Sequence, residues 1–152
     1  MELEEKRKLL TSDLMSRVNY WNDLKVEYKG KAYTLFGYGA GRVTLLANPF
    51  MSVVEEVPLI EEVKPYLRPM ESMTEEERKE LISEFGADIR DEDNGRHTEE
   101  YGYVLVYHNF KEESWFIPFE AIDWLDAHHF DFRGLIKLCL ALEAPTGMYD
   151  FR

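Results

Sequence analysis

The order in which helical and strand patterns follow one another constrains the fold of this chain more than any other feature. Apolar residues recur at helical spacing over residues 3–21, and alternating strand patterns cover residues 24–46. A second helical pattern spans residues 74–85, strand patterns return over residues 103–117, and helical spacing resumes over residues 119–136. A parallel sheet would need a regular alternation of strand and helix, which this order lacks. We therefore predict an α+β fold in which three to four helices pack on an antiparallel or mixed β-sheet.

The clearest local signal in the first half is a β-hairpin. Residues 24–28 and 31–36 alternate between apolar and polar side chains and flank the two turn residues Lys29-Gly30. Residues 42–46 predict a third strand, and Val53-Val54 belong to a fourth.

Capping residues predict where the helices begin. The first helix either runs from about residue 3 to residue 19 or begins near Thr11, which opens a run of good N-cap residues. Thr74 opens a capping box in which its hydroxyl and the Glu77 carboxylate satisfy each other's backbone N–H groups. Gly86 is suited to end that helix.

In the second half, residues 103–107 predict a strand and residues 115–117 are expected to pair near it. A helix is expected from residue 119 to about residue 129. Asp131 is expected to cap a last short helix that starts at the next residue. Residues 148–152 are expected to form a tail beyond the ordered pattern.

The length of the chain suits one domain, residues 1–152. A subdivision near residue 70 stays open, with a β-rich half over residues 1–70 and a helix-strand-helix half over residues 71–152. The middle of the chain carries three prolines, which interrupt both helices and sheet ladders: Pro58, Pro65 and Pro69. We interpret this stretch as a connector that lies across the core and not as a flexible linker.

The chain is strongly acidic. Thirty acidic residues against 18 basic ones give a net charge of −12. Such a charge repels phosphate backbones and argues against direct nucleic-acid binding. The acidic residues are either a solvated surface or a negative face that docks on a basic protein by imitating DNA.

The sequence predicts a soluble, cytoplasmic protein that does not associate with membranes. The first residues contain no apolar stretch of the kind found in secretory signals, and no window reaches the roughly 18 apolar residues of a membrane span. Cys139 is the single cysteine, so no intrachain disulfide and no multi-cysteine zinc site can form. Because it lies between Leu138 and Leu140, we expect it to be a small buried hydrophobic residue.

Two glycine-containing segments look like ligand loops but fail the tests for them. Residues 37–41 are followed by a strand pattern, whereas a phosphate cradle needs a helix there, so we interpret them as a turn. Residues 91–95 lack the register of a calcium loop and predict an exposed turn. We therefore expect no cofactor and no metal ion.

His128 and His129 are the residues most suggestive of chemistry, because Asp123, Asp126 and Asp131 lie close to them in sequence. Imidazole and carboxylate groups could hold a divalent cation or transfer protons. Adjacent residues on a helix point about 100° apart, however, so the two rings cannot chelate together unless the helix ends between them. The alternative is that both histidines lie at a helix C-terminus, with one packed against Phe130 or Trp124.

Two longer segments carry a resemblance to a known family. They are residues 64–77 (KPYLRPMESMTEEE) and residues 122–149 (IDWLDAHHFDFRGLI, running on to LALEAPTGMY). They resemble an uncharacterised family of small proteins encoded by phages, prophages and mobile elements of gut anaerobes. The family has no known activity, so the resemblance implies a biological setting without a mechanism.

The resemblance also bears on individual residues. Related sequences often have glycine where Cys139 stands, which argues against a catalytic thiol and implies that a short helix ends after Ile136. The block from Trp124 to Gly134 is the signature of the family, so a shared function would involve it or it stabilises the fold. The candidate binding residues in this block are Trp124, His128, His129, Asp131 and Arg133.

The leading hypothesis for function is a non-enzymatic phage or mobile-element accessory protein that binds a protein partner of the host or phage. It depends on the missing catalytic motifs, the acidic surface and the aromatic-rich second half. A first alternative is an acidic, DNA-mimicking inhibitor of a host nucleic-acid enzyme. A second is a metal-dependent or acid–base enzyme centred on His128 and His129.

Overall fold

The computed structural model describes residues 1–39, 42–48, 51–57, 60–85, 87–90, 104–108, 113–114 and 119–149. The chain forms two compact units. Met1–Leu67 and Leu135–Asp150 build the first unit, and Arg68–Gly134 builds the second, so the second unit is inserted into the first in sequence. Each unit is described by itself below. Both the single domain and the subdivision near residue 70 stay predictions.

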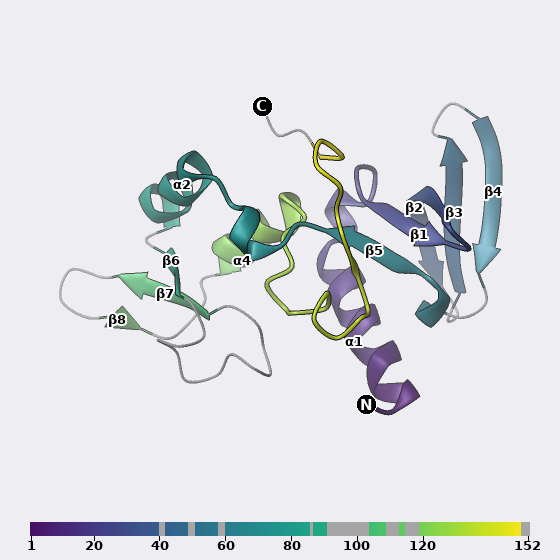
Figure 1. The fold of residues 1–152 in the computed structure, drawn as a ribbon, viewed down its shortest axis with the longest axis horizontal. Coiled ribbons are helices and arrows are strands. Elements are labelled where there is room, and N and C mark those ends of the chain that lie inside the picture. The colour runs from purple at the N-terminus through teal and green to yellow at the C-terminus, as the bar shows by residue number, and fades with distance from the viewer. Residues whose placement is uncertain are drawn as a thin grey trace. The chain divides into compact units, whose positions relative to one another are not determined.

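A six-stranded sheet forms the body of the first unit (Figure 1). Its strands are β1 (Lys25–Tyr28), β2 (Lys31–Gly39), β3 (Arg42–Asn48), β4 (Met51–Val57), β5 (Lys64–Leu67) and β9 (Leu142–Glu143). Their order across the sheet is β4-β3-β2-β1-β5-β9. Neighbouring strands are antiparallel except for β5 and β9, which run parallel. The sheet is therefore mixed, which is one of the two forms predicted, antiparallel or mixed.

The predicted hairpin is present as β1 and β2. Tyr28 pairs with Lys31, which leaves Lys29 and Gly30 as a two-residue loop. Both loop residues have positive φ, 51° and 78°, as the turn that best matches the twist of a hairpin requires. The third and fourth strands predicted after the hairpin are also present, as β3 and β4.

The glycine-rich segment that follows differs from its prediction. Residues 37–39 belong to β2 and pair with β3, so the predicted turn over residues 37–41 is wrong for them, while residues 40 and 41 lie outside the described residues. Pairing of Tyr38 with Val43 in the ladder outweighs the weak strand propensity of glycine. Between Leu35 and Gly37 the register shifts, which marks a β-bulge at Phe36.

The proline-containing middle is in part a strand. Residues 64–67 form β5, which pairs with β1 on one side and with β9 on the other. The prediction of a connector is therefore wrong for this stretch. Pro65 lies opposite Val26 of β1, and on the other side β9 pairs only with Tyr66 and Leu67, so the proline lies where β5 has no paired neighbour in β9.

Helix α1 (Leu3–Ser16) runs without a break past Thr11, so the prediction of a later start is wrong. The backbone N–H of Glu2 donates to the Glu5 carboxylate at 3.2 Å in a capping box at the N-terminus. Leu10 and Leu14 are buried on either side of Thr11. Burial of this apolar stripe outweighs the capping preference of Thr11.

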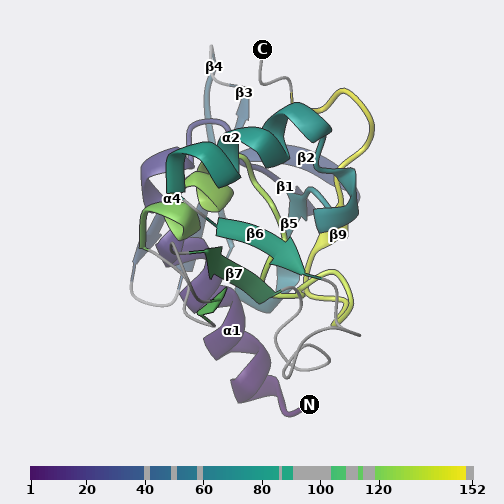
Figure 2. The ribbon, with the colours of Figure 1, turned by 90° about the vertical axis from the view of Figure 1, so that its left-hand side faces the viewer.

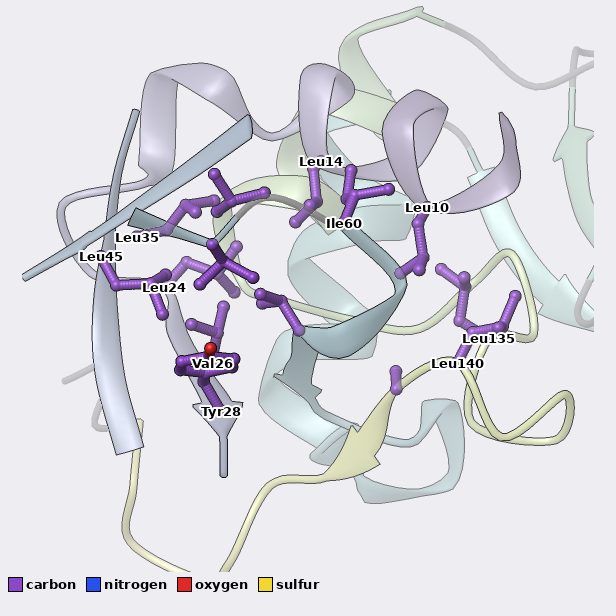
Figure 3. Packing of buried hydrophobic residues seen from close by; sticks show 14 of the residues in the cluster. Leu10, Leu14, Leu24, Val26, Tyr28, Leu35, Leu45, Ile60, Leu135 and Leu140 are labelled. Carbon is purple, nitrogen blue, oxygen red and sulfur yellow. The ribbon is translucent and has the colours of Figure 1, made fainter. Parts of the chain in front are cut away.

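The core of the first unit lies between α1 and the sheet. Figure 3 shows Leu10 and Leu14 of α1 pointing toward side chains of the sheet and of the C-terminal segment. The buried members from those parts include Leu24, Val26, Leu35, Val43, Leu45, Val57, Ile60, Leu67, Leu135 and Leu140. These residues come from both ends of the sequence, so the core of the first unit is complete only when the C-terminal residues have packed against it.

A buried ion pair accompanies this core. Arg17 donates from Nε and Nη2 to the two carboxylate oxygens of Asp13, both at 2.9 Å, and neither side chain is exposed. The bidentate geometry lets two buried charges satisfy each other. Removing one partner of such a pair typically costs about 3–5 kcal/mol, because the other charge is left buried.

In its described residues the second unit contains helices α2 and α4 and a small antiparallel sheet (Figure 2). Its elements are α2 (Glu75–Phe85), β6 (Ala87–Arg90), β7 (Val104–His108), β8 (Glu113–Ser114) and α4 (Phe119–Ala127), with strand order β6-β7-β8. Helices α2 and α4 share a core composed of Met70, Leu81, Ala121, Trp124, Leu125, Phe130 and Phe132. The predicted capping box of α2 is present, because Thr74 and Glu77 exchange two hydrogen bonds of 3.1 Å.

Several boundaries in the second half differ from their predictions. Helix α4 ends at Ala127 and not near residue 129. Residues 132–139 form turns where a short helix capped by Asp131 was expected. The strand predicted over residues 103–107 is present as β7, while Gly86 and the segments predicted at residues 91–95 and 115–117 lie outside the described residues.

Over the residues that the structure describes, the architecture is that of an α+β protein with a mixed sheet and three α-helices, as predicted. Helix α1 packs into the core of the six-stranded sheet, whereas α2 and α4 share the second core. None of the helices in the described ranges has both the length and the apolar character needed to cross a membrane.

Candidate functional site

The residues proposed from the sequence lie at the C-terminal end of α4, in the second unit. Phe130 N–H donates to the Leu125 carbonyl at 3.0 Å, and His129 N–H donates to the Asp126 carbonyl at 3.1 Å. This pair of bonds ends a helix through a residue in the left-handed conformation, and His129 has a φ of 58°. Glycine usually occupies that position because a side chain is strained there. The left-handed backbone conformation of His129 is therefore a consequence of how helix α4 terminates.

Three rings stack where α4 ends. The Trp124 and His128 rings have centroids 4.0 Å apart, and the Trp124 and Phe130 rings have centroids 6.0 Å apart. His128 Nδ1 lies 2.8 Å from the Trp124 carbonyl, which can only accept, so Nδ1 carries a proton. Trp124 Nε1 donates to Glu80 of α2 at 3.2 Å. The stack thus links α4, its terminating loop and α2.

Arg68 holds the other side of this loop. Its N–H donates to the His129 carbonyl at 2.7 Å, and its carbonyl accepts from Asp131 N–H at 2.9 Å. The guanidinium lies over the Phe130 ring, 4.1 Å from the centroid, and donates to both carboxylate oxygens of Glu77 at 2.7 and 2.8 Å. Lysine can make a cation–π contact, but the bidentate pairing with a carboxylate needs the planar guanidinium of arginine.

Glu77 is the carboxylate most affected by this arrangement. Burial acts to raise its pKa, but the hydrogen bonds from Arg68 and from Thr74 outweigh burial, and the net pKa is lowered. Glu77 therefore serves at once as the partner of Arg68 and as the capping residue of α2.

Asp126 and Arg133 form a second ion pair beside the stack. Asp126 is 1% exposed, and Arg133 Nη1 donates to its Oδ1 at 3.0 Å. The Arg133 guanidinium also lies 4.1 Å from the centroid of the Phe132 ring. Asp126, a buried carboxylate of the kind that could act in catalysis or metal binding, is thus paired with Arg133.

The structure places the five candidate binding residues in three neighbouring groups. Trp124 and His128 share the ring stack, whereas His129 and Asp131 flank Phe130 and are joined to Arg68 through their backbones. Arg133 belongs to the ion pair with Asp126. His128 packs on Trp124 at the helix terminus. This is the arrangement predicted from the sequence as the alternative to a metal site. His129 and Asp131 are both buried.

The sequence pointed to Phe130 as a packing partner of a histidine, but it did not single out Arg68 or Glu80 as members of this cluster. Arg68 and Glu80 are distant from Trp124 in sequence, and no local spacing relates them to it. The one available signal was Thr74-Glu77, whose capping box placed Glu77 at the start of α2 but not opposite an arginine.

The chemistry open to this cluster is limited by its contacts. Among the residues that the structure describes, no group of three or more His, Cys, Asp or Glu side chains is placed to hold a metal ion. Two carboxylates of the cluster are engaged by arginines, Asp126 by Arg133 and Glu77 by Arg68. The geometry is that of a cross-linked helix terminus.

Cys139 lies in the first unit and differs from its prediction. It is exposed, not buried, and has a φ of 61°. Leu140 N–H donates to the Leu135 carbonyl and Cys139 N–H to the Ile136 carbonyl, which repeats the bond pattern seen at the end of α4. The left-handed position turns the chain so that Leu140, and not Cys139, enters the core.

A comparison with known proteins found no matching family model, no matching curated protein and no matching solved structure.

Proposed function

We propose that this chain acts by binding another protein, as a non-enzymatic accessory protein of a phage or mobile element. The observation that carries the proposal is Phe36, whose large apolar side chain is 62% exposed within the six-stranded sheet. An aromatic side chain in that position contributes nothing to its own core, and exposed aromatic residues often anchor protein interfaces.

The local backbone explains why Phe36 faces outward. Leu35 pairs with Leu45 and Gly37 with Thr44, so Phe36 is the extra residue of a bulge opposite Thr44. Leu45 is fully buried in the core, and successive residues of a strand point to opposite faces. Thr44 and the bulge therefore lie on the face away from α1. Bulges of this kind commonly re-aim a side chain at functional surfaces.

The test is the capture of a partner by the tagged full chain from lysate of its host, compared with Phe36→Ser and Met15→Ser variants. Met15 is 45% exposed on α1 and serves as the matched control. We expect a stoichiometric partner that the wild type and Met15→Ser retain and Phe36→Ser loses, with all three chains unfolding at similar temperatures. Equal retention by both variants would remove Phe36 from the interface, and no partner for any chain would contradict the proposal.

The acidic inhibitor is a second candidate, favoured by helix α2. This helix exposes a set of carboxylates along its length: Glu75, Glu76, Glu80 and Glu84. Together with the net charge of −12, they could meet the basic surface of a nucleic-acid enzyme. Because Glu80 also accepts from Trp124, only the other three are free of a structural hydrogen bond to the ring stack.

Salt dependence and charge neutralisation distinguish this candidate. If α2 imitates DNA, the triple variant Glu75→Gln, Glu76→Gln and Glu84→Gln loses its partner, and the wild-type complex dissociates as salt rises. A control variant with the same charge change at scattered exposed sites, Glu4→Gln, Glu62→Gln and Glu143→Gln, keeps the partner. A complex that survives high salt and both triple changes would refute charge imitation and point back to the sheet face.

A further inference from the structure

The C-terminal part of the first unit, residues 142–149, lies against strand β5; we refer to it as the strap. Leu142 and Glu143 pair with Tyr66 and Leu67, and Ala144 N–H donates to the Leu67 carbonyl at 2.8 Å. Beyond this contact the next three residues, 145–147, are exposed. The strap is thus attached at its start through a two-residue strand, with little apolar surface buried along its middle.

The far end of the strap is attached through the hydroxyl group of Tyr149. Tyr149 Oη accepts from Lys25 N–H at 2.9 Å and donates to the Tyr66 carbonyl at 2.8 Å. The Lys25 carbonyl oxygen lies 3.5 Å from the same hydroxyl. The hydroxyl therefore contacts backbone groups of β1 and β5 together.

The register of β1 and β5 explains why these groups are available. Val26 pairs with Pro65 and Glu27 with Lys64, so the next position would place Lys25 opposite Tyr66. At that position the Tyr149 hydroxyl bonds to the Lys25 N–H and the Tyr66 carbonyl in place of a direct ladder bond. Burial, the largest influence, raises the pKa of Tyr149, which keeps the hydroxyl protonated and able to donate.

We propose that the strap is a conformational device: it opens and closes as a local unit about the Tyr149 hydroxyl while the core of α1 and strands β1–β4 stays folded. Segments with few buried apolar contacts open at a lower free energy than the whole protein. The buried apolar residues Leu140 and Ala141 lie just before the strap, whereas the middle of the strap is exposed and its end makes hydrogen bonds through Tyr149. Opening uncovers the outer edge of β5 and the Lys25 N–H.

Amide hydrogen exchange of the full chain tests the proposal. In the wild type we expect Lys25 and Ala144 to exchange at a rate that low denaturant does not change, whereas the Leu35 amide, bonded to the Leu24 carbonyl, becomes faster. Tyr149→Phe removes the hydroxyl, and we expect the Lys25 and Ala144 rates to rise about tenfold with the Leu35 rate little changed. The matched variant Tyr38→Phe, which also loses a phenolic hydroxyl, leaves the Lys25 and Ala144 rates as they are.

Two results would overturn the proposal. One is a wild type in which Lys25, Ala144 and Leu35 all share the same rate and denaturant dependence, since the strap would then open only with global unfolding. The other is a Tyr149→Phe variant that exchanges at Lys25 like the wild type, or that accelerates all three amides by one factor. The wild-type denaturant series decides the question even if Tyr149→Phe fails to fold.

Discussion

At the scale of single residues, two helical turns end at side chains in a backbone conformation that favours glycine. His129 and Cys139 both have φ near 60° and both occupy the residue after a helical turn. His129 is fully buried, and Cys139 is exposed. The two sites therefore differ in what a glycine would do: at residue 139 it relieves strain, whereas at residue 129 it also removes buried contacts.

We predict that Cys139→Gly raises the free energy of unfolding by about 0.5–1 kcal/mol, because relief of left-handed strain exceeds the entropy that glycine adds to the unfolded chain. Cys139→Ser keeps the strain and is expected to change stability little. Urea denaturation of the three chains measures the difference. A Cys139→Gly chain less stable than Cys139→Ser would show that the thiol side chain makes a stabilising contact.

A second residue-scale prediction concerns acid. The pKa of Glu77 is lowered in the folded state, so the stability it contributes is present above the ordinary carboxyl value of about 4.3 and is lost as pH falls through the lowered value. Glu77→Gln keeps a side-chain oxygen that accepts from the Thr74 N–H but loses the charge that pairs with Arg68. We expect it to cost about 1–2 kcal/mol at pH 7 and progressively less toward pH 3.

Denaturation of wild type, Glu77→Gln and the exposed control Glu75→Gln across this pH range checks the prediction. A stability gap between wild type and Glu77→Gln that stays constant down to pH 3 would mean that the ion pair with Arg68 contributes nothing to folding.

At the scale of elements, the sequence predicted those features that depend only on neighbouring residues, such as turns and helix caps. The Lys29-Gly30 hairpin and the Thr74 capping box were readable because turn geometry and capping depend on neighbouring residues. Strand β5 was missed because Pro65 argues against a strand, and only pairing with β1 and β9 overrides it. The Arg68 contacts were missed for the same reason: their partners are set by tertiary packing and not by spacing.

The hairpin provides a matched pair of glycines. Gly30 has a φ of 78° and Gly39 does not have positive φ, while an added Cβ at either would meet no atom within 4 Å. Gly30→Ala is therefore expected to cost about 1–2 kcal/mol through backbone strain alone. Gly39→Ala is expected to change stability by no more than about 0.5 kcal/mol. Thermal unfolding of both variants tests the turn; equal effects would contradict the two-residue loop.

At the scale of the whole molecule, the chain passes from the first unit into the second and back. Strands β5 and β9 pair with each other although the second unit lies between them in sequence. Unfolding of the second unit would turn the connection between these strands into a flexible loop, whose closure costs entropy. Sequence patterns did not predict this arrangement, because the two residues of β9 carry no strand signal of their own.

We therefore predict one cooperative unfolding transition. Leu35→Ala in the first core and Leu81→Ala in the second each remove a fully or nearly fully buried side chain and are expected to cost about 2–5 kcal/mol. Both are expected to shift the same transition, followed by tryptophan fluorescence and by circular dichroism. Two separate transitions, each moved by only one substitution, would instead establish two independent domains.

The position of β9 in the sequence also matters while the protein is being synthesised. The ribosome produces β1 to β5, then the whole second unit, and only afterwards β9. During that interval the outer edge of β5 is uncovered in the nascent chain, and uncovered strand edges invite pairing with other chains. Pro65 lacks the N–H donor that such pairing needs. Pro65, which argued against a strand in the sequence, thus protects β5 from aggregation until β9 has been synthesised.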